Sequence, residues 1–216
     1  MASQAPAFEE TPEEIAYELR AAESALWIGS RFLIGIAAFI YASLAFAYFY
    51  LRSANNMGQW RPHHVTAPTA LGAAIFAFTA ATFLCAAYGQ YRFRRNEPAD
   101  WIVAGWTGVL LGALGLGLQI YELTRLPFYP GSSGYASVFI GWGAINIAAL
   151  VLGVYWLETL LARAHRLQRE VKADGGLARS TLPAARLLRA NLEGSTYVWG
   201  FLTLASLFFW IFFYLV

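Results

Sequence analysis

Residues 101–122, WIVAGWTGVLLGALGLGLQIYE, are the stretch that decides the fold. No charged side chain occurs in it before Glu122, and its length matches the roughly 20 residues that a helix needs to cross the hydrocarbon core. Gly108 and Gly112 form a small-xxx-small pair, which lets a neighbouring helix approach closely. We predict a membrane-spanning helix whose Gly108 and Gly112 face packs inside the chain's own bundle or against a stable partner subunit, in preference to a dimerisation motif.

The composition places the whole chain in the same class. Of its 216 residues, 58% are hydrophobic and 13% are charged, whereas soluble domains carry about 25% charged residues. The net charge of +2 is too small to indicate nucleic-acid binding, and the lone Cys85 excludes an internal disulfide. The first 26 residues contain six glutamates and one arginine, which does not match a cleavable secretory signal.

Four more apolar stretches flank the first, and turn-forming or charged segments separate them. The sequence therefore predicts an all-α membrane protein with a single domain, residues 27–216, of five transmembrane helices. The predicted helices are at about 27–51, 69–90, 101–122, 135–162 and 196–216.

Two charged segments accompany this predicted bundle. Residues 1–26 form an acidic cytoplasmic arm with a short amphipathic helix, which Thr11 and Glu14 begin as a capping box. Residues 163–194 form a basic cytoplasmic segment. In it we predict a charged extension of the fourth helix to about Asp174, followed by a short amphipathic helix at the interface.

The basic residues also predict the orientation, because short loops rich in Lys and Arg stay in the cytoplasm. With five helices, one face receives twelve of the fifteen Lys and Arg residues, and the other receives only Arg52, Arg61 and Arg125. This places the N-terminus in the cytoplasm and the C-terminus outside. The acidic arm and the basic segment then share one face, where we expect them to pair.

The three histidines, the usual haem and metal ligands, lie outside the predicted helices. His63 and His64 are adjacent in the first loop, and His165 follows the fourth helix. Two neighbouring histidines without a nearby third ligand do not indicate a metal site, and an intramembrane haem needs ligands that project into the bundle. We assign this chain no cofactor, no metal and no catalytic residue of its own.

Few polar groups touch the predicted helices. Near the end of the fourth helix, Glu158 is interpreted as a member of an interfacial ion pair with Arg163 or Arg166. Gln119 and Glu122 are three residues apart on one helix face and form a polar patch that could bind a partner helix or a lipid headgroup. We also expect Asn146 to form a hydrogen bond between helices.

The order of short motifs resembles subunit III of the haem-copper oxidases, especially the five-helix form of bacterial cytochrome c and quinol oxidases. Most of residues 27–216 take part in the resemblance, and the motif at 116–122 is the most specific. The motifs are AFAYFYLR at 45–52, WRP at 60–62, LGLQIYE at 116–122, GYASVF at 134–139, WGF at 199–201 and WIFFYL at 210–215.

The resemblance implies a non-catalytic accessory subunit of a terminal respiratory oxidase in the cell inner (plasma) membrane. Its partners would be the catalytic subunit I, subunit II and membrane phospholipids, and haem and copper would belong to the partner subunits. Helices 1–2 and 3–5 would form a V-shaped cleft for phospholipid. Arg52, Trp60, Gln119 and Glu122 carry over as candidate lipid or subunit contacts.

The sequence also departs from this family. The carboxylate of the family's first helix is replaced by Ala37 or an apolar neighbour, and the two histidines of its fourth helix fall on Gly143 and Asn146. The histidine and aspartate of its last helix fall near Gly200 and Thr203. These departures favour a largely structural member.

Two alternatives stay open. One is an accessory protein of nitric oxide reductase, which has the same fold beside a different catalytic subunit. The other is a small membrane transporter, which should show a broken helix or charges facing inward near the membrane midplane.

Overall fold

The computed structural model describes residues 11–54, 58, 60–62, 65–95, 97–170, 180 and 182–216. Its regular elements are all helical, and five of them are long and apolar enough to cross a membrane, which confirms the predicted all-α membrane fold. The elements are α1 (Pro12–Ser53), α2 (Thr69–Arg94), α3 (Pro98–Thr124), α4 (Gly134–Glu170), α5 (Pro183–Trp210) and the π turn η1 (Ile211–Leu215).

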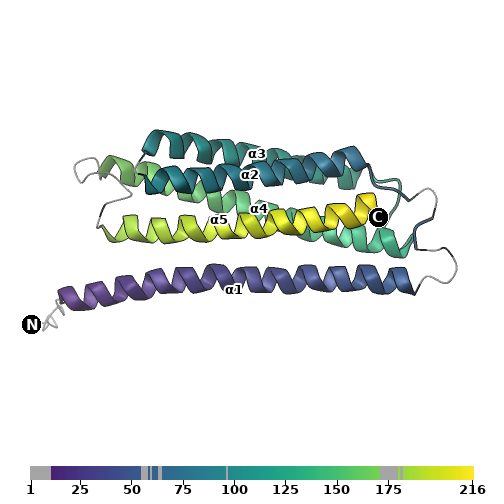
Figure 1. The fold of residues 1–216 in the computed structure, drawn as a ribbon, viewed down its shortest axis with the longest axis horizontal. Coiled ribbons are helices and arrows are strands. Elements are labelled where there is room, and N and C mark those ends of the chain that lie inside the picture. Colours follow the sequence, from purple (N-terminus) through teal and green to yellow (C-terminus); the bar gives the residue numbers. More distant parts are fainter. Residues whose placement is uncertain are drawn as a thin grey trace, which may run out of the picture.

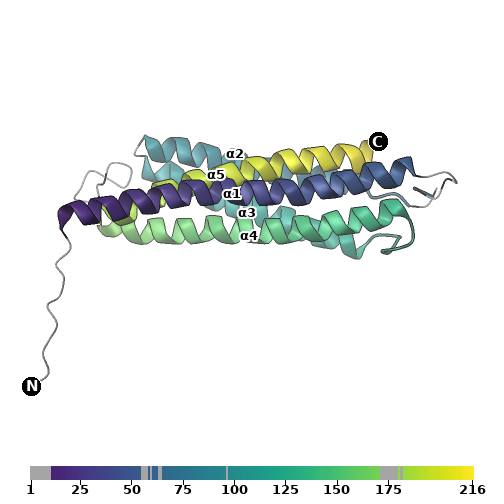
Figure 2. The same ribbon diagram turned by 90° about the horizontal axis from the view of Figure 1, so that it is seen from below.

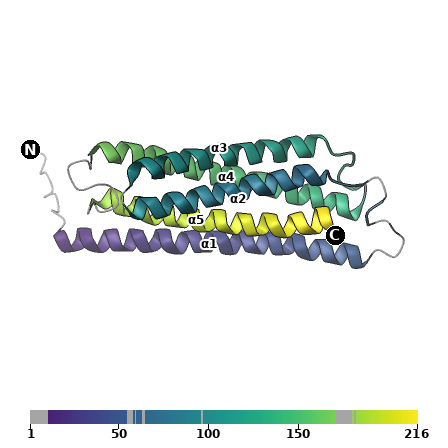
Figure 3. The same ribbon diagram turned by 45° about the horizontal axis from the view of Figure 1, so that its top comes forward.

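The five helices lie side by side and alternate in direction, so Pro12 and Val216 are at opposite ends of the bundle (Figure 1). At one edge, α1 packs on α5 and α4, while α2 packs mainly on α3 and also on α5 (Figures 2 and 3). Extensive contact between α1 and α2 is absent from the described residues. The expected V-shaped cleft between helices 1–2 and 3–5 is therefore wrong, because α2 belongs to the same packed group as α3 and α5.

The predicted capping box at the start of α1 is confirmed. The Thr11 backbone N–H donates to Glu14 Oε2 at 2.8 Å, and the Glu14 N–H donates to Thr11 Oγ1 at 3.3 Å. The helix does not stop before the first transmembrane stretch, however. The predicted surface helix and the first span form one helix of 42 residues, because no proline occurs in its interior to interrupt the hydrogen bonds.

The basic segment belongs to the ends of two helices, α4 and α5. In α5 the predicted interfacial helix and the fifth span are continuous from Pro183 to Trp210. As predicted, α4 extends beyond residue 162 as a charged helix to Glu170, and the expected remainder to Asp174 lies outside the described residues.

The glycine face of α3 packs inside this chain. A Cβ atom added to Gly112 would lie 2.9 Å from Val154 Cγ2 on α4 and 3.2 Å from the Trp199 ring on α5. One added to Gly108 would lie 3.3 Å from Cys85 Cβ on α2. These contacts use the close approach that small residues allow in lipid.

At the end of the bundle where the basic segment lies, ion pairs join neighbouring helices. Arg186 of α5 donates through Nε and Nη2 to the two carboxylate oxygens of Glu23 on α1, at 2.7 and 2.6 Å. This pair confirms the predicted contact between the acidic arm and the basic segment. Glu158 is exposed and forms no ion pair with any described residue, so the ion pair predicted for it is wrong.

Candidate functional site

A chain of buried polar side chains crosses the interior and joins four elements. The Tyr41 hydroxyl of α1 donates to Asn146 Oδ1 of α4 at 3.1 Å, and Asn146 Nδ2 donates to Gln119 Oε1 of α3 at 2.9 Å. Gln119 Nε2 then donates to Glu122 Oε2 at 2.9 Å. The Tyr214 hydroxyl of η1 donates to Glu122 Oε1 at 2.6 Å and completes the chain.

The side chains of this polar chain are sealed from solvent. Gln119, Glu122 and Asn146 are fully buried, and Tyr41 and Tyr214 are 5% and 6% exposed. A buried polar group is costly unless it is hydrogen-bonded, and this set satisfies itself internally. The hydrogen bond expected for Asn146 between helices is thereby confirmed.

The π turn η1 brings Tyr214 to the polar chain. Backbone N–H groups in a π turn bond five residues back instead of four, as Val216 N does with the Ile211 carbonyl at 3.1 Å. Hydroxyls from two other helices hold the turn: Tyr48 donates to the Phe212 carbonyl at 2.8 Å, and Tyr135 donates to the Phe213 carbonyl at 2.9 Å. The turn is thus fixed to α1, α3 and α4 by three tyrosine hydroxyls.

The structure corrects three of the four predicted contact residues. Gln119 and Glu122 are internal, and Trp60 is 8% exposed and packs its ring against Tyr48 and Tyr135, so the prediction that these three contact lipid or a partner is wrong. Arg52 is exposed and donates to the Tyr48 hydroxyl at 3.1 Å, and it remains a candidate surface contact.

The sequence contained a signal for the buried position of Gln119 and Glu122. Counted from Gly108, Gly112 follows at four residues, Gln119 at eleven and Glu122 at fourteen. Residues at this spacing share one face of a helix, so the glycine face that packs inward continues into the two polar residues. The sequence did not predict that Tyr41 and Tyr214 belong to this polar chain, because a tyrosine within an apolar stretch gives no indication of where its hydroxyl points.

A second feature is an apolar groove of about 400 Å³ between α1, α4 and α5. Its walls are almost entirely hydrocarbon, and its lining includes Tyr41, the first member of the polar chain. Residues lining it include Leu33 and Ile40 of α1, Leu152 and Trp156 of α4, and Phe201 of α5.

A basic groove of about 370 Å³ lies farther along α4 and α5, beyond the end of the apolar groove. Arg163 and Arg166 line it above a floor that includes Leu160 and Leu188, and no acidic side chain is among the lining residues. Neither arginine has an ion pair with any residue that the structure describes. On α4, Leu152, Trp156, Leu160 and Arg163 follow at intervals of three or four residues, so both grooves lie on the same face of that helix.

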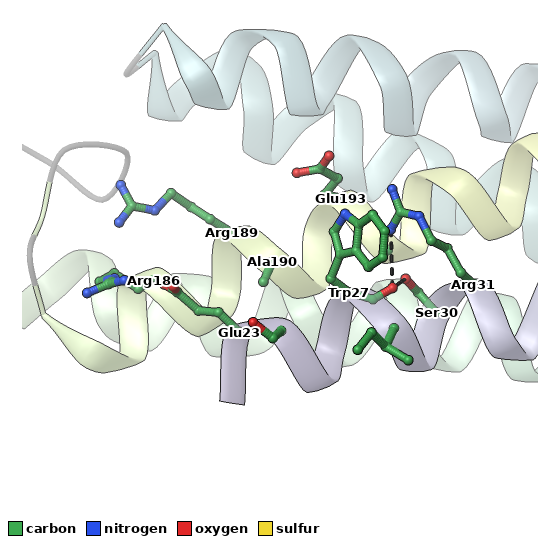
Figure 4. A pocket seen from close by; sticks show the side chains of 11 residues that line it. Glu23, Trp27, Ser30, Arg31, Arg186, Arg189, Ala190 and Glu193 are labelled. Atoms are coloured by element: carbon green, nitrogen blue, oxygen red, sulfur yellow. Dashed lines mark hydrogen bonds and ion pairs between the residues drawn. The ribbon is translucent and has the colours of Figure 1, made fainter. Parts of the chain in front are cut away.

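A third groove, of about 620 Å³, lies between α1 and α5 at the same end of the bundle (Figure 4). The Glu23 and Arg186 pair lies at one end of it, and the Arg31 guanidinium stacks over the Trp27 ring at 3.4 Å from the ring centroid. This groove contains both signs of charge, whereas the groove at Arg163 and Arg166 contains only the positive one.

Metal ligands do not gather in the part of the chain that the structure describes: no group of three His, Cys, Asp or Glu side chains could hold an ion there. His63 and His64 lie outside the described residues. Comparison of the chain with models of known protein families and with curated protein sequences gave no match. The chain is thus characterised by its fold, that of a five-helix, multi-pass membrane protein.

Proposed function

We propose that this chain is a non-catalytic accessory subunit of a terminal respiratory oxidase, in which a haem-copper partner subunit reduces oxygen to water. The proposal begins from the ordered motifs that resemble subunit III of these enzymes. Electrons would come from cytochrome c or quinol, and the chain would stabilise subunits I and II in the cell inner membrane. Its N-terminus would lie in the cytoplasm.

The main observation in favour of a structural role is the buried polar chain from Tyr41 to Tyr214, whose members hydrogen-bond to one another. A transporter needs polar groups or irregular backbone that face a substrate pathway near the midplane. Here the intramembrane carboxylate Glu122 has both oxygens occupied by internal donors. The transmembrane helices α1 to α4 are unbroken, and the π turn lies at the end of the last one. These features favour a structural role for the chain and argue against the alternative of a small transporter.

We further propose that the chain binds an anionic phospholipid along α4 and α5. The apolar groove suits an acyl chain, and Arg163 and Arg166 lie beyond one end of it, where a phosphate headgroup would reach them. This replaces the cleft expected between helices 1–2 and 3–5. Each basic residue near an anionic membrane surface contributes about 1 kcal/mol of attraction.

The oxidase proposal is tested by purifying the chain from its native membrane in mild detergent. We expect haem absorption in the same peak, stoichiometric partner chains and consumption of oxygen by the complex. A complex that reduces nitric oxide instead would indicate the reductase accessory protein. A colourless, monodisperse chain that moves a solute into liposomes would contradict both readings.

The lipid proposal predicts an effect of replacing Arg163 and Arg166 together by glutamine. Loss of about 2 kcal/mol corresponds to roughly 30-fold weaker retention of phosphatidylglycerol, because each 1.4 kcal/mol is a tenfold change. Native mass spectrometry of the purified protein with added phosphatidylglycerol or phosphatidylcholine measures this. Arg125→Gln, at the other end of the bundle, is the matched control and should retain the lipid. Equal retention by all three proteins would refute the site.

A further inference from the structure

The polar chain has a direction, and every donor in it points toward Glu122. From Tyr41 through Asn146 and Gln119, each side chain donates to the next, and Tyr214 donates to Glu122 from the other side. Both carboxylate oxygens are therefore acceptors. A deprotonated carboxylate is acceptor-only, so this pattern is the one that fits an ionised Glu122.

No cation compensates Glu122 within the described residues. Three elements present tyrosines toward it or its neighbours: Tyr214 from η1, Tyr135 from α4 and Tyr48 from α1. The Arg61 guanidinium lies 4.7 Å from the centroid of the Tyr135 ring. Just past the end of α3, Arg125 is exposed and lies over the Tyr121 ring.

The remaining neighbours place no charge in contact with Glu122 within the described residues. The first four turns of α2, residues 69–84, contain no titratable side chain, and Arg52 of α1 contacts the Tyr48 hydroxyl at the outside of the cluster. An uncompensated carboxylate inside a membrane bundle is expensive, and such groups commonly exchange protons. The observed hydrogen bonds suit the ionised form of Glu122, and a protonated Glu122 would need the neighbouring amides to turn.

We propose that Glu122 reversibly binds a proton, and that its protonation reverses the direction of the hydrogen-bond chain from Tyr41 to Gln119. A proton taken up from water would form an O–H bond on Glu122 Oε2, which then donates where it had accepted. Gln119 must turn its amide to present Oε1, and its Nε2 then faces Asn146. Asn146 turns in the same way, and the Tyr41 hydroxyl rotates to accept from it. Release of the proton to water restores the original direction.

This reversal would connect two distant features of the fold. Tyr41 lines the apolar groove between α1, α4 and α5, and Tyr214 belongs to the π turn at the other end of the chain of hydrogen bonds. The protonation state of Glu122 would thus decide whether the Tyr41 hydroxyl donates a hydrogen bond to Asn146 or accepts a hydrogen bond from it. The inference concerns the chain itself and holds whether or not a haem-copper subunit is its partner.

Infrared difference spectroscopy of the full-length protein in lipid nanodiscs, between acid and alkaline pH, tests the proposal. In the wild type we expect a carboxylic acid C=O band at low pH, which slowly exchanges with deuterium, together with side-chain amide bands that change in the same titration. Glu122→Gln should remove the carboxylic acid band, and Gln119→Leu should remove part of the amide signal. Glu158→Gln, which changes an exposed carboxylate, should leave both signals in place.

Each other outcome overturns part of the proposal. If the wild type and Glu122→Gln give the same difference spectrum, Glu122 does not exchange a proton. If the carboxylic acid band titrates while the amide bands stay constant, Glu122 binds a proton but the chain does not reverse. Melting curves of the variants, recorded in the same nanodiscs, establish that each one is folded before its spectrum is interpreted.

Discussion

Replacing Gly112 by leucine is expected to destabilise the bundle by about 3 kcal/mol, at the upper end of the usual cost of overpacking a core. A Cβ atom at this position would already lie 2.9 Å from Val154 and 3.2 Å from Trp199, and Thr82 of α2 is only slightly farther away at 3.4 Å. The three further carbons of leucine would have to displace three helices at once. In the proposed oxidase complex, the same change should release the chain from the proposed partner subunits on a native gel.

Gly117→Leu is the matched control for Gly112→Leu. It is the same substitution in the same helix, but no atom lies within 4 Å of an added Cβ. Because leucine has the higher helix propensity, this variant should be as stable as the wild type or slightly more stable. Equal melting of the two variants would contradict a tightly packed glycine face.

The single cysteine offers a direct measurement of this difference. Cys85 is partly buried in α2, beside Gly108. A thiol-reactive dye that fluoresces when Cys85 becomes accessible reports unfolding of the α2–α3 contact in detergent. The fluorescence of Gly112→Leu should rise at a much lower temperature than the fluorescence of Gly117→Leu.

The sequence predicted the helices well because the length of an apolar stretch is a local property. Turn-forming residues such as Pro68 and Pro98 mark helix starts that the structure places at Thr69 and Pro98. The continuity of α1 and α5 was missed because amphipathic and apolar segments were treated as separate helices. Nothing in the backbone interrupts either one, and the Glu23 and Arg186 pair holds their charged ends together.

Which helices contact one another could not be predicted in the same way. The choice of α2 to pack on α3 and α5 depends on how side chains from distant segments fit, and alternating direction alone allows several arrangements. The position of Glu122 illustrates the point. Its spacing from Gly112 was visible in the sequence. Its partner Tyr214, however, is 92 residues away and lies in a π turn that no local sequence pattern predicts.

The second large effect is expected from Glu122→Leu. Leucine is similar in size but accepts no hydrogen bond, so Gln119 Nε2 and the Tyr214 hydroxyl would both be left buried without a partner. Each orphaned group costs about 1–3 kcal/mol, whereas an average hydrogen bond between membrane helices contributes about 0.6 kcal/mol. The loss should therefore exceed that of an ordinary interhelical bond several times over.

Glu122→Gln separates the hydrogen bonds from the charge. The amide keeps one acceptor for Gln119, and its NH₂ group can donate to the Tyr214 hydroxyl if that hydroxyl rotates. Thermal melting of the purified chain should therefore place Glu122→Gln close to the wild type and Glu122→Leu far below it. If leucine is tolerated as well as glutamine, the Tyr214 and Gln119 hydrogen bonds to Glu122 are dispensable to the fold, and the π turn is held by the Tyr48 and Tyr135 hydroxyls.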